Sequence, residues 1–123
     1  MQDPFTHKVI ACALEVHKTL GPGLLESIYE TCLSIELTKA NLPHTRQQKL
    51  PIIYKGQPID LDFKADIIVE NTLILEIKSV QQLLPVHEAQ LLTYLKVSNL
   101  PIGLLLNFNE TVLKNGIRRR INT

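Results

Sequence analysis

Tryptophan is absent from the 123-residue chain, and aromatic residues of all kinds make up only 5% of it. Proteins that bind single-stranded nucleic acid by base stacking rely on aromatic side chains, so the composition does not indicate that mode of recognition. Neither sign of charge is in large excess, because 13 lysines and arginines face 12 acidic residues, a formal net charge of +1. This balance neither requires nor excludes a nucleic-acid partner, since a local basic patch can exist within it.

Long apolar runs are also missing. The longest uninterrupted runs contain a handful of residues, far fewer than the roughly 20 of a membrane-spanning helix. Residues 1–7 lack the features of a signal peptide. The two cysteines, Cys12 and Cys32, have no Cys-x-x-Cys partner and no histidine at zinc-finger spacing. We interpret both as core thiols in a reducing compartment, and we expect a cytoplasmic protein with no membrane partner.

What is present is an ordinary globular composition, with 45% apolar and 20% charged residues. A length of 123 residues suits one domain and leaves too little chain for a second core. We therefore expect residues 1–123 to form a single domain that folds without covalent or metal staples.

The spacing of apolar residues predicts two N-terminal helices and a later third one. Apolar residues recur at helical spacing from Phe5 to Leu20, and the segment Gly21-Pro22-Gly23 ends that helix. A second helix is expected at residues 24–40, with Pro43 preventing its continuation. Pro85 suits the first turn of a third helix, which is expected to end near Ser98.

The segments between and after these helices predict strands. A turn is expected at Lys55-Gly56-Gln57-Pro58. The expected strands lie at residues 45–54, within 59–79 as two strands, at 101–107 and, as a short final strand, at 117–121. The fold class is therefore α/β, a mixed central β-sheet flanked by helices. The helix between the third and fourth strands predicts a crossover that makes those two strands parallel.

Residues 61–70 alternate between apolar and charged side chains, as a strand with one buried face does, and residues 73–78 continue the pattern. A three-residue loop, Glu70-Asn71-Thr72, is the connection that keeps one face of this hairpin apolar. The facing pairs are then Val69 with Leu73, Ile67 with Leu75, Ala65 with Ile77 and Asp66 with Glu76.

The pairing of Asp66 with Glu76 has a chemical consequence. Side chains that face each other across two strands have Cβ atoms roughly 4.5–5.5 Å apart, and two carboxylates at that distance repel. A divalent cation between them relieves the repulsion, and Mg²⁺ takes one or two carboxylates while keeping its waters. Lys78 projects beside this position, where an ammonium orients a water and offsets charge on a phosphate. The simpler alternative is that all three residues belong to a solvated polar face.

Three motifs in order along the chain resemble those of a known family. Asp66 followed by Glu76-Ile77-Lys78 resembles the Asp…Glu-x-Lys signature of the PD-(D/E)XK nuclease superfamily, with Ala65 where the superfamily name has proline. Gln90-Leu91-Leu92-Thr93-Tyr94 resembles the Gln-x-x-x-Tyr motif of RecB-like relatives. Gly23-Leu24-Leu25-Glu26-Ser27-Ile28-Tyr29 resembles the motif of the GxxExxY family within that superfamily. The likeness extends from about Val9 to the C-terminal strand.

The resemblance implies a restriction-endonuclease-like core and metal-dependent hydrolysis of phosphodiester bonds in DNA or RNA. It implies that Asp66, Glu76, the backbone carbonyl of Ile77 and Glu26 hold Mg²⁺ or Mn²⁺. In such sites Lys78 positions or activates the attacking water, so that Lys78, Asp66, Glu76 and Glu26 form the catalytic set.

The resemblance also implies that Gln90, Tyr94 and Tyr29 bind the substrate or support the site. Each assignment has a structural alternative: Glu26 as an acid favoured at a helix start, Tyr29 as a core aromatic, and the other two as an exposed helix edge. We interpret His17 and His87 as structural histidines. The cluster Arg118-Arg119-Arg120 is either a solvated strand or a source of phosphate contacts.

Two functions remain open at this point. The first is a Mg²⁺- or Mn²⁺-dependent nuclease acting on nucleic acid, chiefly DNA. The second is a catalytically silent module of the same fold that binds nucleic acid or a protein. The intact acid–acid–lysine set favours the first, whereas the short chain leaves little room for a DNA-gripping subdomain. A homodimer would supply the missing groove.

Overall fold

The computed structural model describes residues 3–59 and 63–123, and the elements lie in the order expected from the sequence, with a short strand at Gln57–Ile59 and a 3₁₀-helix at Leu113–Gly116 added. The helices and strands are α1 (Pro4–Leu20), α2 (Glu26–Lys39), β1 (His44–Lys49), β2 (Ile52–Tyr54), β3 (Gln57–Ile59), β4 (Lys64–Val69), β5 (Leu73–Lys78), α3 (Pro85–Ser98), β6 (Ile102–Asn107), the 3₁₀-helix η1 (Leu113–Gly116) and β7 (Ile117–Ile121).

The limits of α1 follow from residues at its two ends. The side chain of Asp3 accepts a hydrogen bond from the backbone N–H of Thr6 at 2.7 Å, which satisfies one of the free donors of the first turn. Pro4 occupies the first turn, where its missing N–H is tolerated. At the other end Gly21 adopts a φ of 72°, which ends the helix. The predicted breaking role of the Gly-Pro-Gly segment is thus confirmed.

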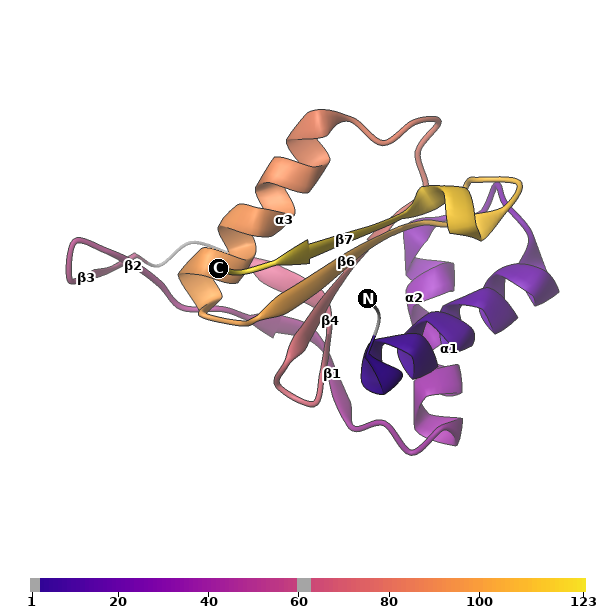
Figure 1. Ribbon diagram of the computed structural model, residues 1–123, viewed down its shortest axis with the longest axis horizontal. Coiled ribbons are helices and arrows are strands. Elements are labelled where there is room, and N and C mark those ends of the chain that lie inside the picture. The colour runs from indigo at the N-terminus through magenta and orange to yellow at the C-terminus, as the bar shows by residue number, and fades with distance from the viewer. Residues whose placement is uncertain (1–2, 60–62) are drawn as a thin grey trace.

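The main sheet has five strands in the order β1-β4-β5-β6-β7. Strands β5 and β6 are parallel, as predicted from the helix α3 that connects them, and the other neighbouring strands are antiparallel. Helices α1 and α2 lie together on one side of this sheet and α3 lies on the other (Figure 1). The predicted α/β class with a mixed, helix-flanked sheet is therefore confirmed.

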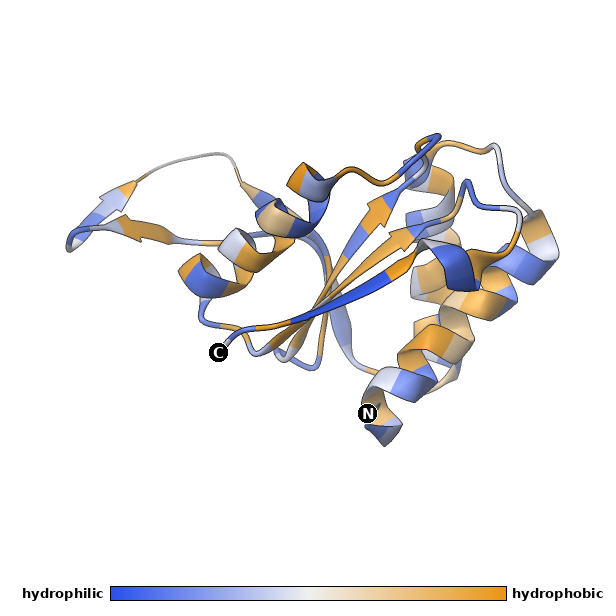
Figure 2. Ribbon diagram, turned by 45° about the horizontal axis from the view of Figure 1, so that its top comes forward, coloured by the Kyte–Doolittle hydropathy of each residue, from blue (hydrophilic) through white to orange (hydrophobic). Residues whose placement is uncertain are grey.

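Two hydrophobic cores fill the spaces between the sheet and its helices, and Figure 2 shows hydrophobic residues along the central strands and the helices beside them. The larger core joins α1 and α2 to the sheet and contains Val9, Val16, Tyr29, Leu33, Ile67, Leu75, Ile77 and Leu104 among others. The smaller core joins α3 to the sheet and consists of Leu50, Ala65, Ile68, Ile74, Leu91, Leu95 and Leu105. Within the part of the chain that the structure describes, no helix has the length and apolar character needed to cross a bilayer.

The strand predicted at residues 45–54 is wrong in one respect, because it is divided. Strand β1 ends at Lys49, Leu50 and Pro51 lie outside any strand, and β2 pairs with β3 in a separate two-stranded sheet. Pro51 has no N–H to continue the β1 ladder, which accounts for the break. The predicted turn reduces to Lys55-Gly56, and residues 61 and 62 of the expected next strand lie outside the described residues.

Candidate active site and metal centre

The β4–β5 hairpin brings the two principal acidic residues together. Its loop is formed by Glu70, Asn71 and Thr72, and the strands pair Val69 with Leu73 and Ile67 with Leu75, as the apolar alternation predicted. Glu70 and Asn71 have positive φ values of 50° and 51°, which gives the chain the tight reversal of this loop.

A side-chain hydrogen bond connects the strands next to this paired region. The Asp66 carboxylate oxygen Oδ2 accepts the backbone N–H of Ile77 at 2.8 Å. After burial, the charge of Asp66 is the largest cause that raises the pKa of Glu76, so the two carboxyl groups lie near each other. The strand pairing extends from Val69 with Leu73 to Ile67 with Leu75, so the facing of Asp66 with Glu76 lies one step beyond it and stays a prediction.

The predicted pairing of Ala65 with Ile77 is wrong. Ala65 lies in the smaller core on the α3 side, whereas Ile77 lies in the larger core under α1 and α2. The physical reason is that the Asp66 side chain takes the Ile77 N–H that a regular ladder would use. The strict alternation of faces therefore stops at Asp66.

The pKa of Asp66 is raised above its ordinary value. Burial is the main cause that raises the pKa of its carboxyl, and the hydrogen bond from Ile77 is the main cause that opposes the rise. The negative charges of Glu30 and Glu26 raise the pKa further. The Asp66 carboxylate thus lies in a locally negative environment that favours a cation.

Glu76 is more strongly perturbed, because its side chain is only 9% exposed. Burial, followed by the charge of Asp66, raises the pKa of Glu76 to about 8, and the nearby Lys78 ammonium opposes this. The oxygen Oε1 of Glu76 is buried and has no hydrogen-bond partner among residues 3–59 and 63–123. A buried carboxylate oxygen without a partner is costly, and a bound cation is one way to satisfy it.

Ile77 and Lys78 complete this edge of β5. An extended residue directs its N–H and its C=O to the same neighbouring strand, so the Ile77 carbonyl lies on the side of Asp66. The Lys78 side chain is half-buried and follows Glu76 by two residues, which places both on the same face of β5. The Lys78 carbonyl accepts the N–H of Phe108 at 2.9 Å, which fixes the end of the strand.

Glu26 reaches the same region from the first turn of α2. Its oxygen Oε2 accepts the backbone N–H of Ser79 at 3.2 Å, just beyond the end of β5. The charge of Glu26 raises the pKa of both Asp66 and Glu76. The structure therefore brings the helical acid predicted from the sequence close to the acidic pair.

Tyr29 supports the loop that precedes Glu26. Its hydroxyl donates to the carbonyl of Gly21 at 2.6 Å and accepts the N–H of Leu24 at 3.1 Å. The ring is fully buried and stacks on Phe108 with the centroids 4.6 Å apart. Of the two functions that the sequence suggested for Tyr29, support is the one that this position allows, and contact with substrate is not.

Helix α3 contributes Tyr94 and Gln90 from the other side of the sheet. Burial raises the pKa of Tyr94, and the charges of Glu76 and Asp66 raise it further, so the phenol lies close to both acids. The Gln90 side chain, four residues earlier on the same helix face, opposes this rise in the pKa of Tyr94. The Tyr94 ring also packs on Phe63, with centroids 3.9 Å apart.

Two residues of this region were missed in the sequence. Glu30 is buried, forms an ion pair with Arg46 at 3.0 Å and accepts a hydrogen bond from Gln47 at 2.6 Å. Gln47 also donates to Asp66 at 3.3 Å. The signal for Glu30 was its spacing of four residues from Glu26, which puts both acids on one helix face. Gln47 carried no comparable signal.

The histidines lie elsewhere and serve structural contacts. His17 Nε2 is 2.7 Å from the carbonyl of Glu110, and His87 Nδ1 accepts the backbone N–H of Leu84. His44 lies 2.7 Å from the Ser34 hydroxyl through Nε2 and 2.9 Å from the Leu42 carbonyl through Nδ1.

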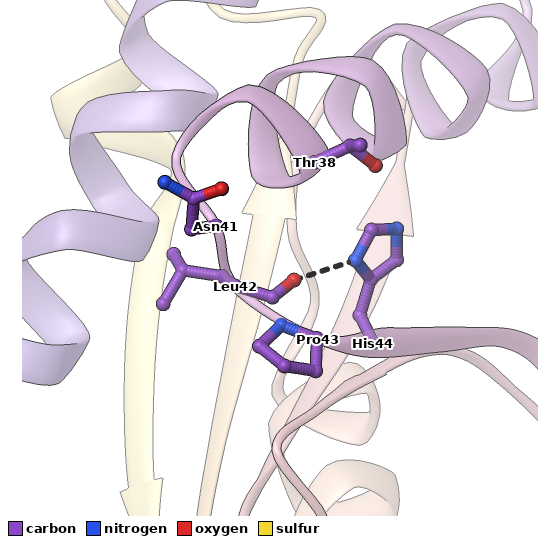
Figure 3. A pocket seen from close by; sticks show the side chains of 5 residues that line it. All are labelled: Thr38, Asn41, Leu42, Pro43 and His44. Atoms are coloured by element: carbon purple, nitrogen blue, oxygen red, sulfur yellow. Dashed lines mark hydrogen bonds between the residues drawn. The ribbon is translucent and has the colours of Figure 1, made fainter.

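A pocket of about 430 Å³ is lined by Thr38, Asn41, Leu42, Pro43 and His44 (Figure 3). None of these lining residues is a candidate site residue. This pocket therefore does not mark the chemistry, whereas a hollow of about 380 Å³ is lined by Glu26 and Ser79 beside the acidic pair.

The residues that meet there fit a hard divalent cation. Two carboxylates and a backbone carbonyl are oxygen ligands of the kind that Mg²⁺ takes while keeping several waters. The partnerless oxygen of Glu76 is consistent with this use. Among the described residues no group of three or more histidine, cysteine, aspartate or glutamate side chains is arranged to hold a metal. A metal bound here would therefore depend on water and backbone oxygen as well as on Asp66 and Glu76.

Comparison with known proteins gave one match. The family model described as the PD-(D/E)XK nuclease superfamily matches residues 3–120. No curated protein and no solved structure matches the chain.

Proposed function

Because the chain belongs to the PD-(D/E)XK nuclease superfamily, we propose that it hydrolyses phosphodiester bonds of DNA or RNA with Mg²⁺ or Mn²⁺ held at Asp66 and Glu76. The observation that carries this proposal is the surroundings of Glu76. Its carboxyl is buried beside a second acid and has an oxygen without a partner, and its pKa is raised to about 8. A buried carboxyl with a raised pKa and a partnerless oxygen suits a metal site, which uses each of these features.

The residues have distinct roles in this proposal. Asp66, Glu76 and the Ile77 carbonyl would hold the metal, with Glu26 completing its water shell. The bound metal would polarise the phosphate and lower the pKa of a water. Lys78 places its ammonium beside Glu76, where it orients the attacking water and offsets charge on the phosphate.

Helix α3 and the start of α2 supply the remaining roles. Tyr94 lies near the acids on the α3 side and Gln90 is exposed on the same helix, and both would contact the nucleic acid. We further infer that the chain belongs to the GxxExxY branch, since Gly23, Glu26 and Tyr29 occupy that motif. The positions of Gln90 and Tyr94 likewise support kinship with RecB-like nucleases.

Cleavage of labelled oligonucleotides tests the proposal. Single-stranded, duplex and structured DNA and RNA are incubated with Mn²⁺ or Mg²⁺ and the products are separated by size. We expect cleavage by the wild type and a loss of at least about 100-fold in Lys78→Ala and in Asp66→Asn, because each removes a group that acts on the reacting phosphate. Lys18→Ala and Glu15→Gln change exposed residues of α1 and serve as matched controls.

Two outcomes would contradict the proposal. Cleavage that persists at the wild-type rate in purified Lys78→Ala and Asp66→Asn would show that the activity comes from elsewhere. Metal binding at Asp66 without cleavage of any tested nucleic acid would favour the alternative, a catalytically silent module that binds nucleic acid or a protein.

A further inference from the structure

A small β-hairpin stands apart from the main sheet. It consists of β2 and β3, and its turn is Lys55-Gly56, with φ values of 48° and 81°. Two successive residues of positive φ form the tight turn that suits a short hairpin. Figures 1 and 2 both show the hairpin projecting from the body beyond α3. A two-stranded hairpin is marginally stable alone, so its projection suits contact with another molecule.

The tip of this hairpin exposes an aromatic ring beside a cation. Tyr54 is 61% exposed, and the Lys55 ammonium lies 5.4 Å from the centroid of its ring. The sequence from residue 44 to residue 59 contains arginine and lysine but no acidic residue. An exposed ring and the ammonium that lies over it match a nucleobase and the phosphate next to it.

The base of the hairpin adjoins the candidate active site. The backbone N–H of Leu50 donates to the carbonyl of Phe63 at 3.1 Å and so closes the base. Phe63 packs on Tyr94 at 3.9 Å between centroids. The charges of Glu76 and Asp66 act on Tyr94 and, after burial, raise its pKa, which puts these acids in its neighbourhood. The hairpin therefore rises from the edge of the acidic site.

The reach of the hairpin is comparable with a short stretch of nucleic acid. Extended chain from Leu50 to Gly56 spans at most about 20 Å at roughly 3.3 Å per residue, or about six steps of 3.4 Å along a duplex. A substrate bound at Asp66 and Glu76 thus extends past the tip within a few nucleotides.

We propose that the β2–β3 hairpin is a nucleic-acid-binding arm, in which Tyr54 stacks on an unpaired base and Lys55 contacts the adjacent phosphate. The location of the cleaved bond rests on the proposed function, whereas binding by the arm does not. The substrate class is nucleic acid with unpaired nucleotides beside the cleaved bond, such as a single strand, an overhang or a flap. Blunt duplex is a poorer ligand, because its bases are already stacked and paired.

Fluorescence anisotropy with labelled single-stranded and blunt duplex oligonucleotides tests the arm, with Ca²⁺ in place of Mg²⁺ to suppress hydrolysis. We expect Tyr54→Ala to weaken single-strand binding about tenfold and Tyr54→Phe to retain it, because stacking needs only the ring. Lys55→Ala should reduce the slope of log Kd against log salt by about 0.7, the contribution of one phosphate contact.

Ile53→Thr is the matched control. Ile53 is 63% exposed on the same strand, and successive residues of a strand point to opposite faces. We expect this variant to bind like the wild type. Light scattering of the wild type and Tyr54→Ala gives the oligomeric state of both proteins.

Each result separates the arm from the proposed activity. Wild-type binding by Tyr54→Ala, or an equal loss on single strand and duplex, would overturn the arm. Conversion of a wild-type dimer to a monomer by Tyr54→Ala would overturn it too, since the hairpin would then be a subunit contact. Binding that depends on Tyr54, without cleavage in Mn²⁺, would support the arm and contradict the proposed hydrolysis. Cleavage that Tyr54→Ala leaves unchanged would contradict the arm and support the proposed hydrolysis.

Discussion

Glu76 combines burial, a neighbouring acid and an oxygen without a partner. A carboxyl in such surroundings prefers its neutral form, which is why its pKa is raised to about 8 from an ordinary value of 4.5. The neutral form does not serve as a metal ligand, so metal binding and proton loss are coupled at this residue.

The metal-free protein is therefore expected to lose stability as the pH rises. Between about pH 4.5 and pH 8 the unfolded chain releases the Glu76 proton while the folded chain retains it, so the free energy of unfolding falls with increasing pH. Glu76→Gln removes this titration. In EDTA we expect the variant to exceed the wild type at pH 8 by on the order of 2–4 kcal/mol. Urea unfolding across this pH range measures the difference.

Glu15→Gln is the control for this prediction, because Glu15 is exposed on α1. Its stability should follow the wild type at every pH. Parallel pH curves for wild type and Glu76→Gln would show that Glu76 ionises normally in the folded chain.

The pairing of Ile67 with Leu75 and of Val69 with Leu73 could be predicted from the sequence, because apolar alternation allows only one register for the hairpin. The depth at which Glu76 is buried could not. It depends on α3, which places Tyr94 close to the acids from a segment nearly 20 residues later in the chain. The hydrogen bond from the Ile77 N–H to the Asp66 carboxylate could not be predicted either, because it takes the place of a regular backbone hydrogen bond.

Among the elements, α3 and β6 pack most closely at Gly103. A Cβ atom at this position would lie 2.7 Å from Leu91 Cδ1, which is shorter than real contacts allow. Leu91 is fully buried in the smaller core, so its side chain has little space to move. Gly103 thus permits the approach of the helix that covers the acidic site.

Gly103→Ala is expected to destabilise the protein by about 1–3 kcal/mol, because the added methyl overpacks this contact. Thermal unfolding by circular dichroism measures the loss. Gly103→Ala combined with Leu91→Ala should recover part of it relative to Leu91→Ala alone, since the truncated side chain frees the space. An unchanged melting temperature in Gly103→Ala would contradict the packing described here.

The three helices could be predicted closely, because proline and glycine mark their ends. Helix α3 begins at Pro85 and ends at Ser98 as expected. The separate β2–β3 hairpin could not be predicted, because the pattern of residues 45–54 favours one continuous strand and the expected turn after it does not show which sheet its flanking strands join. Whether two strand segments join one sheet depends on contacts with other elements, which local preference does not encode.

In the whole molecule, the sheet gathers site residues from distant parts of the chain. Glu26 comes from a helix on one side, Tyr94 from a helix on the other, and the acidic pair from the strands between them. The motif residues therefore follow one another along the chain without a fixed interval, because they come from separate elements. The functional residues converge only after both helical layers have packed on the sheet.

The arginine cluster of β7 contributes to this assembly. Arg119 forms an ion pair with Asp3 at 3.3 Å, next to the start of α1, and Arg120 forms an ion pair with Glu88 on α3. The edge strand is thereby joined to helices on both sides of the sheet. These contacts give Arg119 and Arg120 a structural role, which neither the solvated strand nor the phosphate contacts suggested by the sequence had described.

The central claim, that Asp66 and Glu76 share a divalent cation, is tested most directly by calorimetric titration of the intact chain with Mn²⁺ at pH 7. Repeating the titration in buffers of different ionisation enthalpy counts the protons released. We expect one binding event with release of roughly one proton, because Glu76 is protonated before the metal binds. Glu76→Gln should bind at least tenfold more weakly and release no proton. Equal affinity in that variant, or binding without proton release, would contradict the account.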